Sequence, residues 1–150
     1  MKKEMYRYPK EVILEVTNRC NLKCRYCHFH GIEALPGRPL GDMKRKTWEN
    51  ILMQIGEWPG PVTLMTHGAG EPLLYPDLSD LLQKAKKIPH LSVGFMTNGM
   101  LLDKSWVARL IELQIDWLAL SIDGVVPETH DFFRRRADLR KIEENVMWLI

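Results

Sequence analysis

Four short apolar segments, each rich in aliphatic, β-branched or aromatic residues, recur along the chain. They are "EVILEV" (11–16), "PVTLM" (61–65), "LSVGFM" (91–96) and "DWLALSI" (116–122). Their apolar character is nearly continuous rather than alternating, which is typical of strands that are covered on both faces. The pattern therefore predicts four strands of a parallel sheet.

After each predicted strand, apolar residues recur at the three- and four-residue spacing of an amphipathic helix. The four stripes are Trp48, Ile51, Leu52 and Ile55; Leu78, Leu81, Leu82 and Ala85; Trp106, Leu110 and Leu113; and Leu139, Ile142, Val146 and Leu149. Asp77 and Asp103 precede the second and third stripes and are candidate N-caps. A strand followed by a helix four times predicts an α/β fold with right-handed crossovers between parallel strands.

The composition indicates one ordinary globular domain over residues 1–150. The chain is 45% hydrophobic and 27% charged, and its net charge of +2 is too small to indicate nucleic acid or an anionic membrane as a partner. No apolar run approaches a membrane span, and "MKKEMYRYPKEV" lacks the apolar stretch of a secretory signal. We therefore expect a cytoplasmic protein, with the Gly/Pro-rich loop 31–46 as its most mobile segment.

A cluster of polar residues and glycines follows each predicted strand. In chain order the clusters are "TNRCNLKCRYC", "THGAGEPLL", "TNGMLL" and "SIDG". The carboxyl ends of parallel strands share one edge of a sheet, and ligands bind at that edge. The four clusters are therefore expected to converge on one site.

The first cluster contains every cysteine of the chain. Cys20, Cys24 and Cys27 form a CxxxCxxC arrangement, followed by His28 and His30. Three thiols in one loop indicate a metal or redox site kept reduced in the cytosol rather than a disulfide framework. Two sites fit: a Cys₃His zinc site, or an iron–sulfur cluster with three protein ligands and one open iron. The spacing favours the cluster, although a ferredoxin-type cluster would need a fourth cysteine.

Together the four clusters resemble the motifs of the radical S-adenosylmethionine (radical SAM) superfamily. "CNLKCRYC" is similar to the CxxxCxxC signature of that family, and "GAGEP" (68–72) is similar to its second motif, with Ala69 where many members have glycine. "TNG" (97–99) and "SIDG" (121–124) resemble the motifs of its third and fourth strands. The C-terminal stretch from "SIDG" to "ENV" looks most like members with a SPASM or twitch extension, which modify peptides or proteins.

The resemblance implies a fold and a chemistry. The fold would be a partial (β/α)6 TIM-like barrel, of which this chain holds the N-terminal four β/α units, without the last two and without any extension. Cys20, Cys24 and Cys27 would bind a 4Fe–4S cluster, and S-adenosylmethionine would chelate the fourth iron. Reductive cleavage of S-adenosylmethionine would yield methionine and a 5′-deoxyadenosyl radical. This radical would take a hydrogen atom from a peptide, protein or small molecule. The electron would come from a flavodoxin- or ferredoxin-like donor. A truncated and inactive domain remains an alternative.

The resemblance also implies that six further residues contact S-adenosylmethionine: Tyr26, Gly70, Glu71, Asn98, Ser121 and Arg134. Tyr26 would lie against the adenine, and Asn98 would face the ribose or the methionine end. Gly70 and Glu71 would face the amino group. Ser121 and Arg134 would hold the carboxylate.

Each of these roles has a plainer structural alternative. Tyr26 could be a core residue, Glu71 a helix-capping carboxylate, and Asn98 part of an Asn-Gly turn. The run Arg134–Arg136 could be a solvated basic face. The roles expected for the remaining polar residues of the motifs are a turn position for Asp123, neighbouring or surface positions for His28, His30 and His67, and support of the thiolates for Lys23 and Arg25.

Overall fold

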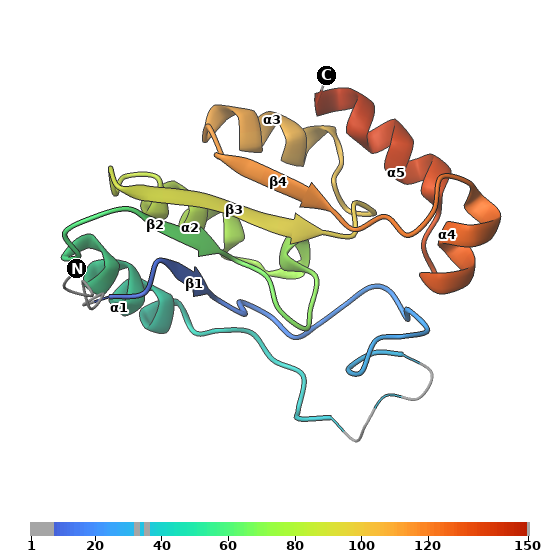
Figure 1. Cartoon of the computed structure of the whole chain (residues 1–150), viewed down its shortest axis with the longest axis horizontal. Coiled ribbons are helices and arrows are strands. Elements are labelled where there is room, and N and C mark those ends of the chain that lie inside the picture. Colours follow the sequence, from blue (N-terminus) through green and yellow to red (C-terminus); the bar gives the residue numbers. More distant parts are fainter. Residues whose placement is uncertain (1–7, 32–33, 35–36, 150) are drawn as a thin grey trace, which may run out of the picture.

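The computed structural model describes residues 8–31, 34 and 37–149 and contains a parallel four-stranded sheet (Figure 1). The strands are Glu11–Ile13 (β1), Val62–Met65 (β2), Leu91–Thr97 (β3) and Trp117–Leu120 (β4). Their order in the sheet is β1-β2-β3-β4, so each strand pairs in parallel with its neighbour in sequence. This is the order found in the wall of a β/α barrel, and the predicted α/β class is confirmed.

The predicted helical stripes all form helices. The helical segments are Arg45–Gly56 (α1), Pro72–Leu74 (η1, 3₁₀), Leu78–Ala85 (α2), Lys104–Glu112 (α3), Pro127–Phe133 (α4), Leu139–Val146 (α5) and Met147–Leu149 (η2, 3₁₀). The third and fourth stripes extend beyond their helices, because Leu113 is the C-cap of α3 and Leu149 lies on η2 rather than on α5. Helix α4 has no counterpart among the predicted stripes, because its buried residue is His130 and it carries no apolar stripe.

Of the two predicted N-caps, one forms the capping hydrogen bond. The carboxylate of Asp103 accepts from the backbone N–H of Trp106 at 2.9 Å and caps α3. Asp77 occupies the N-cap position of α2, but its side chain accepts no capping hydrogen bond and lies 3.6 Å from Arg45 instead. The position of this cap was therefore correct, whereas its expected bond was not formed.

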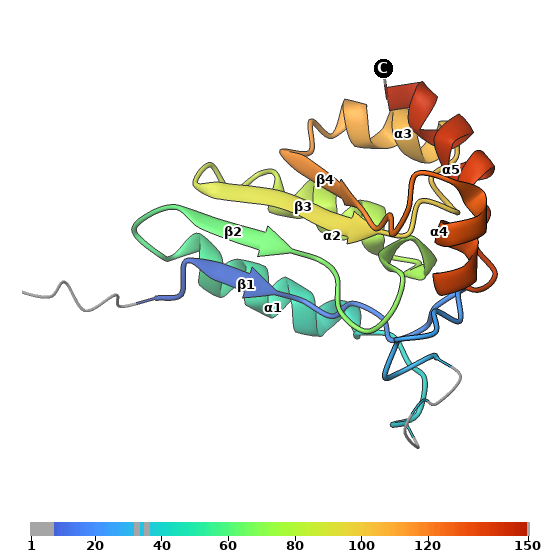
Figure 2. The same ribbon diagram turned by 45° about the vertical axis from the view of Figure 1, so that its right-hand side comes forward.

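One face of the sheet carries the core. Val62 and Leu64 of β2 are buried, whereas Thr63 and Met65 between them are half-exposed. The buried strand residues pack in one cluster with residues of α1, α2 and α3, which lie together behind the sheet (Figure 2). The expectation that the strands are covered on both faces was wrong for β1, β2 and β4, because these helices lie on a single face.

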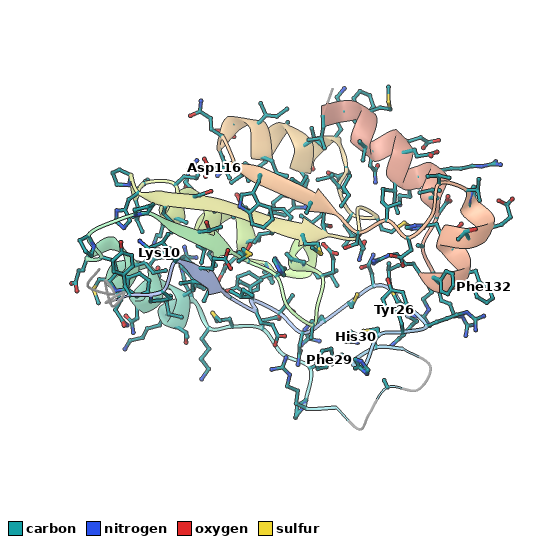
Figure 3. All side chains as sticks on the ribbon, in the orientation of Figure 1. Lys10, Tyr26, Phe29, His30, Asp116 and Phe132 are labelled. Atoms are coloured by element: carbon teal, nitrogen blue, oxygen red, sulfur yellow. The ribbon has the colours of Figure 1, made fainter. Side chains whose placement is uncertain are left out.

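The loops after the four strands meet at one edge of the sheet. In Figure 1 the arrowheads of the strands point toward the cysteine loop and α4, which close this edge. Figure 3 shows Tyr26, Phe29 and His30 at this end, away from Lys10 and Asp116 at the other end. The predicted mobility of loop 31–46 concerns a segment of which residues 32–33 and 35–36 lie outside the described residues. Within the described ranges, no helix has the length and apolar character needed to cross a membrane.

Candidate functional site

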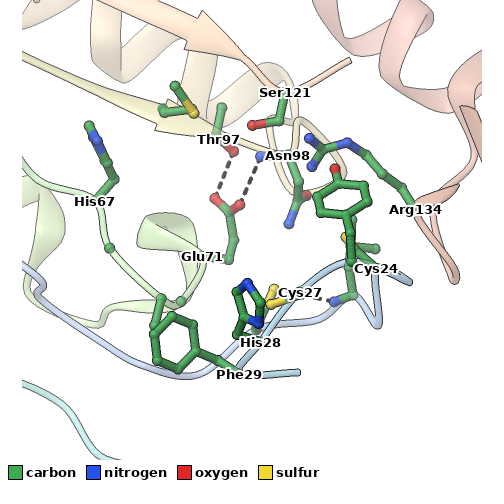
Figure 4. A pocket seen from close by; sticks show the side chains of 17 residues that line it. Cys24, Cys27, His28, Phe29, His67, Glu71, Thr97, Asn98, Ser121 and Arg134 are labelled. Atoms are coloured by element: carbon green, nitrogen blue, oxygen red, sulfur yellow. Dashed lines mark hydrogen bonds between the residues drawn. The ribbon is translucent and has the colours of Figure 1, made fainter. Parts of the chain in front are cut away.

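A cavity of about 300 Å³ opens where the four strands end (Figure 4). Its lining includes every residue that was selected from the sequence as a cluster or cofactor ligand: Cys20, Cys24, Tyr26, Cys27, Gly70, Glu71, Asn98, Ser121 and Arg134. Ligand-binding cavities commonly begin at this size. The predicted convergence of the strand ends on one site is therefore observed.

The cysteine loop holds three free thiols at the mouth of the cavity. Cys20, Cys24 and Cys27 are each partly buried and form no disulfide. Backbone N–H groups approach two of the sulfurs, Leu22 at 3.5 Å from Cys20 Sγ and His30 at 3.3 Å from Cys27 Sγ. Within the part of the chain that the structure describes, no group of three or more Cys, His, Asp or Glu side chains forms a ready site for a metal ion. All three thiol-bearing residues line the same cavity.

Burial raises the pKa of two of these thiols, Cys20 and Cys24. Burial raises the pKa of Cys20, and the hydrogen bond from the N–H of Leu22 partly opposes this rise. Burial also raises the pKa of Cys24, and there the opposing charge is Arg134. We had expected Lys23 and Arg25 to favour the thiolate. Instead, the Arg25 guanidinium lies 4.0 Å from the ring centroid of Phe132, so the cation that acts on Cys24 comes from the far end of the sequence.

Glu71 is buried between the second and third strand ends. Its Oε1 accepts from the Thr97 hydroxyl at 2.6 Å and from the N–H of Leu73 at 3.2 Å, and its Oε2 accepts from the N–H of Asn98 at 2.9 Å. Burial raises the pKa of Glu71, and these donors oppose that rise. The alternative of a capping carboxylate is confirmed, because Glu71 is the N-cap of η1. Thr97, which was not selected from the sequence, holds this carboxylate in place.

Asn98 and Gly70 join the cysteine loop to the neighbouring strand ends. The Asn98 amide donates to Asn21 Oδ1 at 2.8 Å, while its own oxygen accepts from the N–H of Met100 at 3.0 Å, as in an Asn-Gly turn. A Cβ on Gly70 would overlap the backbone oxygens of Thr17 and Arg19. Glycine at position 70 therefore allows a close approach of the backbone of residues 17 and 19, whereas its expected contact with S-adenosylmethionine stays a prediction.

Tyr26, Asp123 and Arg134 form a hydrogen-bonded group at the rim. The Tyr26 hydroxyl donates to Asp123 Oδ2 at 2.5 Å, and Arg134 Nη2 donates to Asp123 Oδ1 at 3.1 Å. Tyr26 is 53% exposed, which excludes the core alternative. Burial and the bond to Asp123 raise the pKa of Tyr26 to about 12. Despite its partial burial, Asp123 has a lowered pKa because Tyr26 and Arg134 donate to it.

Asp123 is a site residue to which the sequence analysis assigned only a turn. Its backbone N–H lies 3.3 Å from Nδ1 of His130, a fully buried residue of α4. The signal that could have revealed it is its position in the fourth strand-end motif. Its partner Tyr26 is 97 residues away in sequence, however, and only the folded chain brings the two together.

The three histidines near the site lie in different environments. His28 is exposed and His67 partly buried, and both line the cavity; burial lowers the pKa of His67. His30 is buried, and among the described residues its Nε2 has no hydrogen-bond partner.

Ser121 lines the cavity from the end of β4, and its N–H donates to the Thr97 carbonyl at 2.9 Å.

Comparison with known proteins identifies the family. The model of the radical SAM superfamily matches residues 14–150. The chain is 34% identical over 128 residues to pre-heme d1 synthase of Dinoroseobacter shibae and 28% identical over 134 residues to a probable GTP 3′,8-cyclase of Methanothermobacter thermautotrophicus. The chain therefore belongs to the radical SAM superfamily, a family of enzymes that use a 4Fe–4S cluster and S-adenosylmethionine.

A solved structure shows the same fold. The enzyme anSMEcpe, with bound AdoMet and the Cp18Cys peptide, superimposes with a TM-score of 0.77 at 25% identity, over 95% of this chain and 40% of that one. The matches to the two curated relatives include 84% and 89% of this chain. They span only 30% and 41% of the length of those relatives. Its four β/α units match the N-terminal part of the radical SAM barrel, as predicted.

Proposed function

We propose that this chain is the cofactor-binding part of a radical SAM enzyme, in which Cys20, Cys24 and Cys27 are the protein ligands of one 4Fe–4S cluster. The observation that carries the proposal is that three free thiols from one loop line the same cavity as all six residues proposed for S-adenosylmethionine. When bound, the two cofactors supply reductive cleavage of S-adenosylmethionine and a 5′-deoxyadenosyl radical. The protein holds them and keeps the reaction from water.

The side chains fit an amino acid–like ligand with charges at both ends. Glu71 supplies a carboxylate for a cationic amino group, with its position held by Thr97 and Asn98. Within the described residues the Ser121 hydroxyl has no protein partner, and Arg134 keeps donors beyond those that Asp123 accepts; both suit a carboxylate. Tyr26 offers a ring face for adenine at the rim.

We further propose a peptide or protein as substrate, reduction by a flavodoxin- or ferredoxin-like donor, and a cytoplasmic location. The support for a peptide is the anSMEcpe structure, which contains one, and the SPASM-like sequence after β4. The names of the two curated relatives, pre-heme d1 synthase and probable GTP 3′,8-cyclase, indicate small-molecule substrates. A small-molecule substrate is therefore the competing outcome. Neither nucleic acid nor a membrane is proposed as a partner.

Anaerobic reconstitution with iron and sulfide tests the cluster. We expect roughly four irons and four sulfides per chain, with a broad charge-transfer absorbance that oxygen bleaches. Serine in place of Cys20, Cys24 or Cys27 should abolish this absorbance. The matched controls His28→Ala, at the cavity, and His30→Ala, in the same loop, should retain it.

Two other results would contradict the proposal in different ways. Tightly held stoichiometric zinc that is lost in His28→Ala or His30→Ala would identify a Cys₃His zinc module. A cluster whose absorbance and paramagnetic spectra do not change when S-adenosylmethionine is added would identify a domain that keeps the cluster but no longer binds the second cofactor.

A further inference from the structure

A second hollow lies behind the cysteine loop. It has a volume of about 230 Å³ and is lined by Lys23, Gly31, Arg135 and Arg136. None of these residues lines the first cavity, whereas Cys24 and Cys27 do. The cysteine loop therefore has the thiols on one side and a basic surface on the other.

The three cations of this hollow are exposed. Within the described residues, Lys23, Arg135 and Arg136 form no ion pair. Neighbouring Arg134, by contrast, is paired with Asp123, and Arg45, Lys84 and Lys86 on the helical side of the molecule are also paired with carboxylates. The hollow thus presents a positive field that no carboxylate of the described chain neutralises.

The backbone builds this surface from two distant segments. The N–H of Lys23 donates to the Arg135 carbonyl at 3.0 Å, and the N–H of Arg25 donates to the Phe133 carbonyl at 2.8 Å. Arg136 has a φ of 73°, a conformation that costs energy for any residue except glycine. The fold therefore keeps an arginine at a position where glycine would be less strained.

The hollow is directly connected to the thiol-bearing residues. Lys23 precedes Cys24 in sequence, and the N–H of Gly31 donates to the Cys27 carbonyl at 2.9 Å. One hydrogen bond and a few covalent bonds thus separate the hollow from the Cys27 sulfur. Because S-adenosylmethionine would occupy the first cavity, this side of the loop is an approach that the bound cofactor leaves open.

We propose that Lys23, Arg135 and Arg136 form the docking surface for a one-electron donor protein whose contact face is rich in carboxylates. The proposal rests on the proposed function, because it requires the cluster. In the reaction the donor is oxidised by one electron and the cluster is reduced by one. Electron-transfer contacts are small and transient, so charge complementarity is well suited to form them.

The test is the rate at which a reduced flavodoxin reduces the cluster-loaded chain, followed anaerobically by rapid mixing. At low ionic strength the triple variant Lys23→Glu, Arg135→Glu, Arg136→Glu should react about 10- to 100-fold more slowly than the parent, and its rate should no longer fall as salt is added. Iron content, S-adenosylmethionine binding and the final extent of reduction by excess dithionite should be unchanged, because the small reductant does not need the docking surface.

Two single variants separate the charge from the fold. Arg136→Gly removes one charge and relieves the positive φ, so it should slow reduction by flavodoxin without lowering the free energy of unfolding. Lys87→Glu reverses an exposed charge after α2 and should leave the rate within about twofold of the parent.

Wild-type reduction rates by flavodoxin in the triple variant would overturn the proposal. A second result would also overturn it: phosphate slows reduction by flavodoxin more than chloride does at equal ionic strength, while the charge reversals have no effect on the rate. That result would place donor docking elsewhere. Failure of the parent chain to load a cluster, or to be reduced by dithionite, would instead contradict the proposed function itself.

Discussion

At the scale of single residues, the carboxylate of Glu71 joins two strand ends. Its two oxygens accept from three donors, the Thr97 hydroxyl and the N–H groups of Leu73 and Asn98. A glutamine has one acceptor oxygen in place of two, and its amide nitrogen would face a donor. Glu71 therefore has a structural role in addition to the role in cofactor binding that we propose.

We expect Glu71→Gln to lower the free energy of unfolding by about 1–3 kcal/mol, because a buried donor loses its acceptor. Urea denaturation under anaerobic conditions measures the change. Glu112→Gln is the matched control, since Glu112 is an exposed partner of Arg109 on α3 and its replacement should have a much smaller effect. Equal unfolding midpoints for the parent and Glu71→Gln would show that these three hydrogen bonds contribute little.

The site residues at the strand ends, such as Cys20, Glu71 and Asn98, were accessible from the sequence because each lies in a polar cluster that follows a predicted strand. The hydrogen-bonded group of Tyr26, Asp123 and Arg134 was not. Arg134 was selected as a carboxylate-binding residue, and in the structure it does bind a carboxylate, that of Asp123. That pairing depends on where α4 lies, and α4 carries no periodic apolar signal from which it could be predicted.

At the scale of elements, Asp116, the residue before β4, links the start of this strand to β3. Its carboxylate accepts from the N–H of Val93 at 2.7 Å and lies 2.7 Å from Lys86 Nζ, far from the cysteine loop (Figure 3). Burial opposes ionisation, but Lys86 and the Val93 N–H outweigh it and lower the pKa of Asp116 below its ordinary value of 3.8. The folded state thus favours the charged form.

We expect Asp116→Asn to lower the free energy of unfolding by about 1 kcal/mol at pH 7, a small value because the pair is partly solvated. Since the folded pKa is lowered, this contribution is present above 3.8 and is lost as the pH falls through the folded value. Urea titrations of both proteins should therefore converge in acid. Asp80→Asn, at an exposed carboxylate of α2, controls for the loss of a surface charge. A difference that persisted at low pH would assign the effect to packing.

The elements with a strong apolar period were predictable, and the others were not. The helices α1, α2, α3 and α5 followed from their stripes. The strands β1 and β4 are shorter than the apolar segments that predicted them, because hydrogen bonding to a neighbouring strand, and not hydrophobicity, defines where a strand ends.

At the scale of the whole molecule, the outer edge of β4 has no partner strand within the described part of the chain. All four residues of β4 are half-exposed, and among the described residues no strand lies on that side. Leu118 and Leu120 pack against the core, so Ala119 lies on the opposite face. Open strand edges pair readily with other chains.

We expect the isolated chain 1–150 to self-associate in a concentration-dependent manner, as measured by light scattering. Ala119→Lys places a charge on the open face of β4 and should shift the population toward the monomer. Ala108→Lys makes the same substitution at an exposed position of α3 and should not. A monomer at all concentrations would show that the edge is protected in another way.

The order of the strands in the sheet also determines when the site can come into being. Because each strand pairs with the one before it, the chain can fold unit by unit while it is being synthesised. The cysteine loop is synthesised before its backbone partners Phe133 and Arg135 and before Arg134, whose charge acts on Cys24. The three cysteines therefore remain on an incomplete surface until the chain has been made through Arg135.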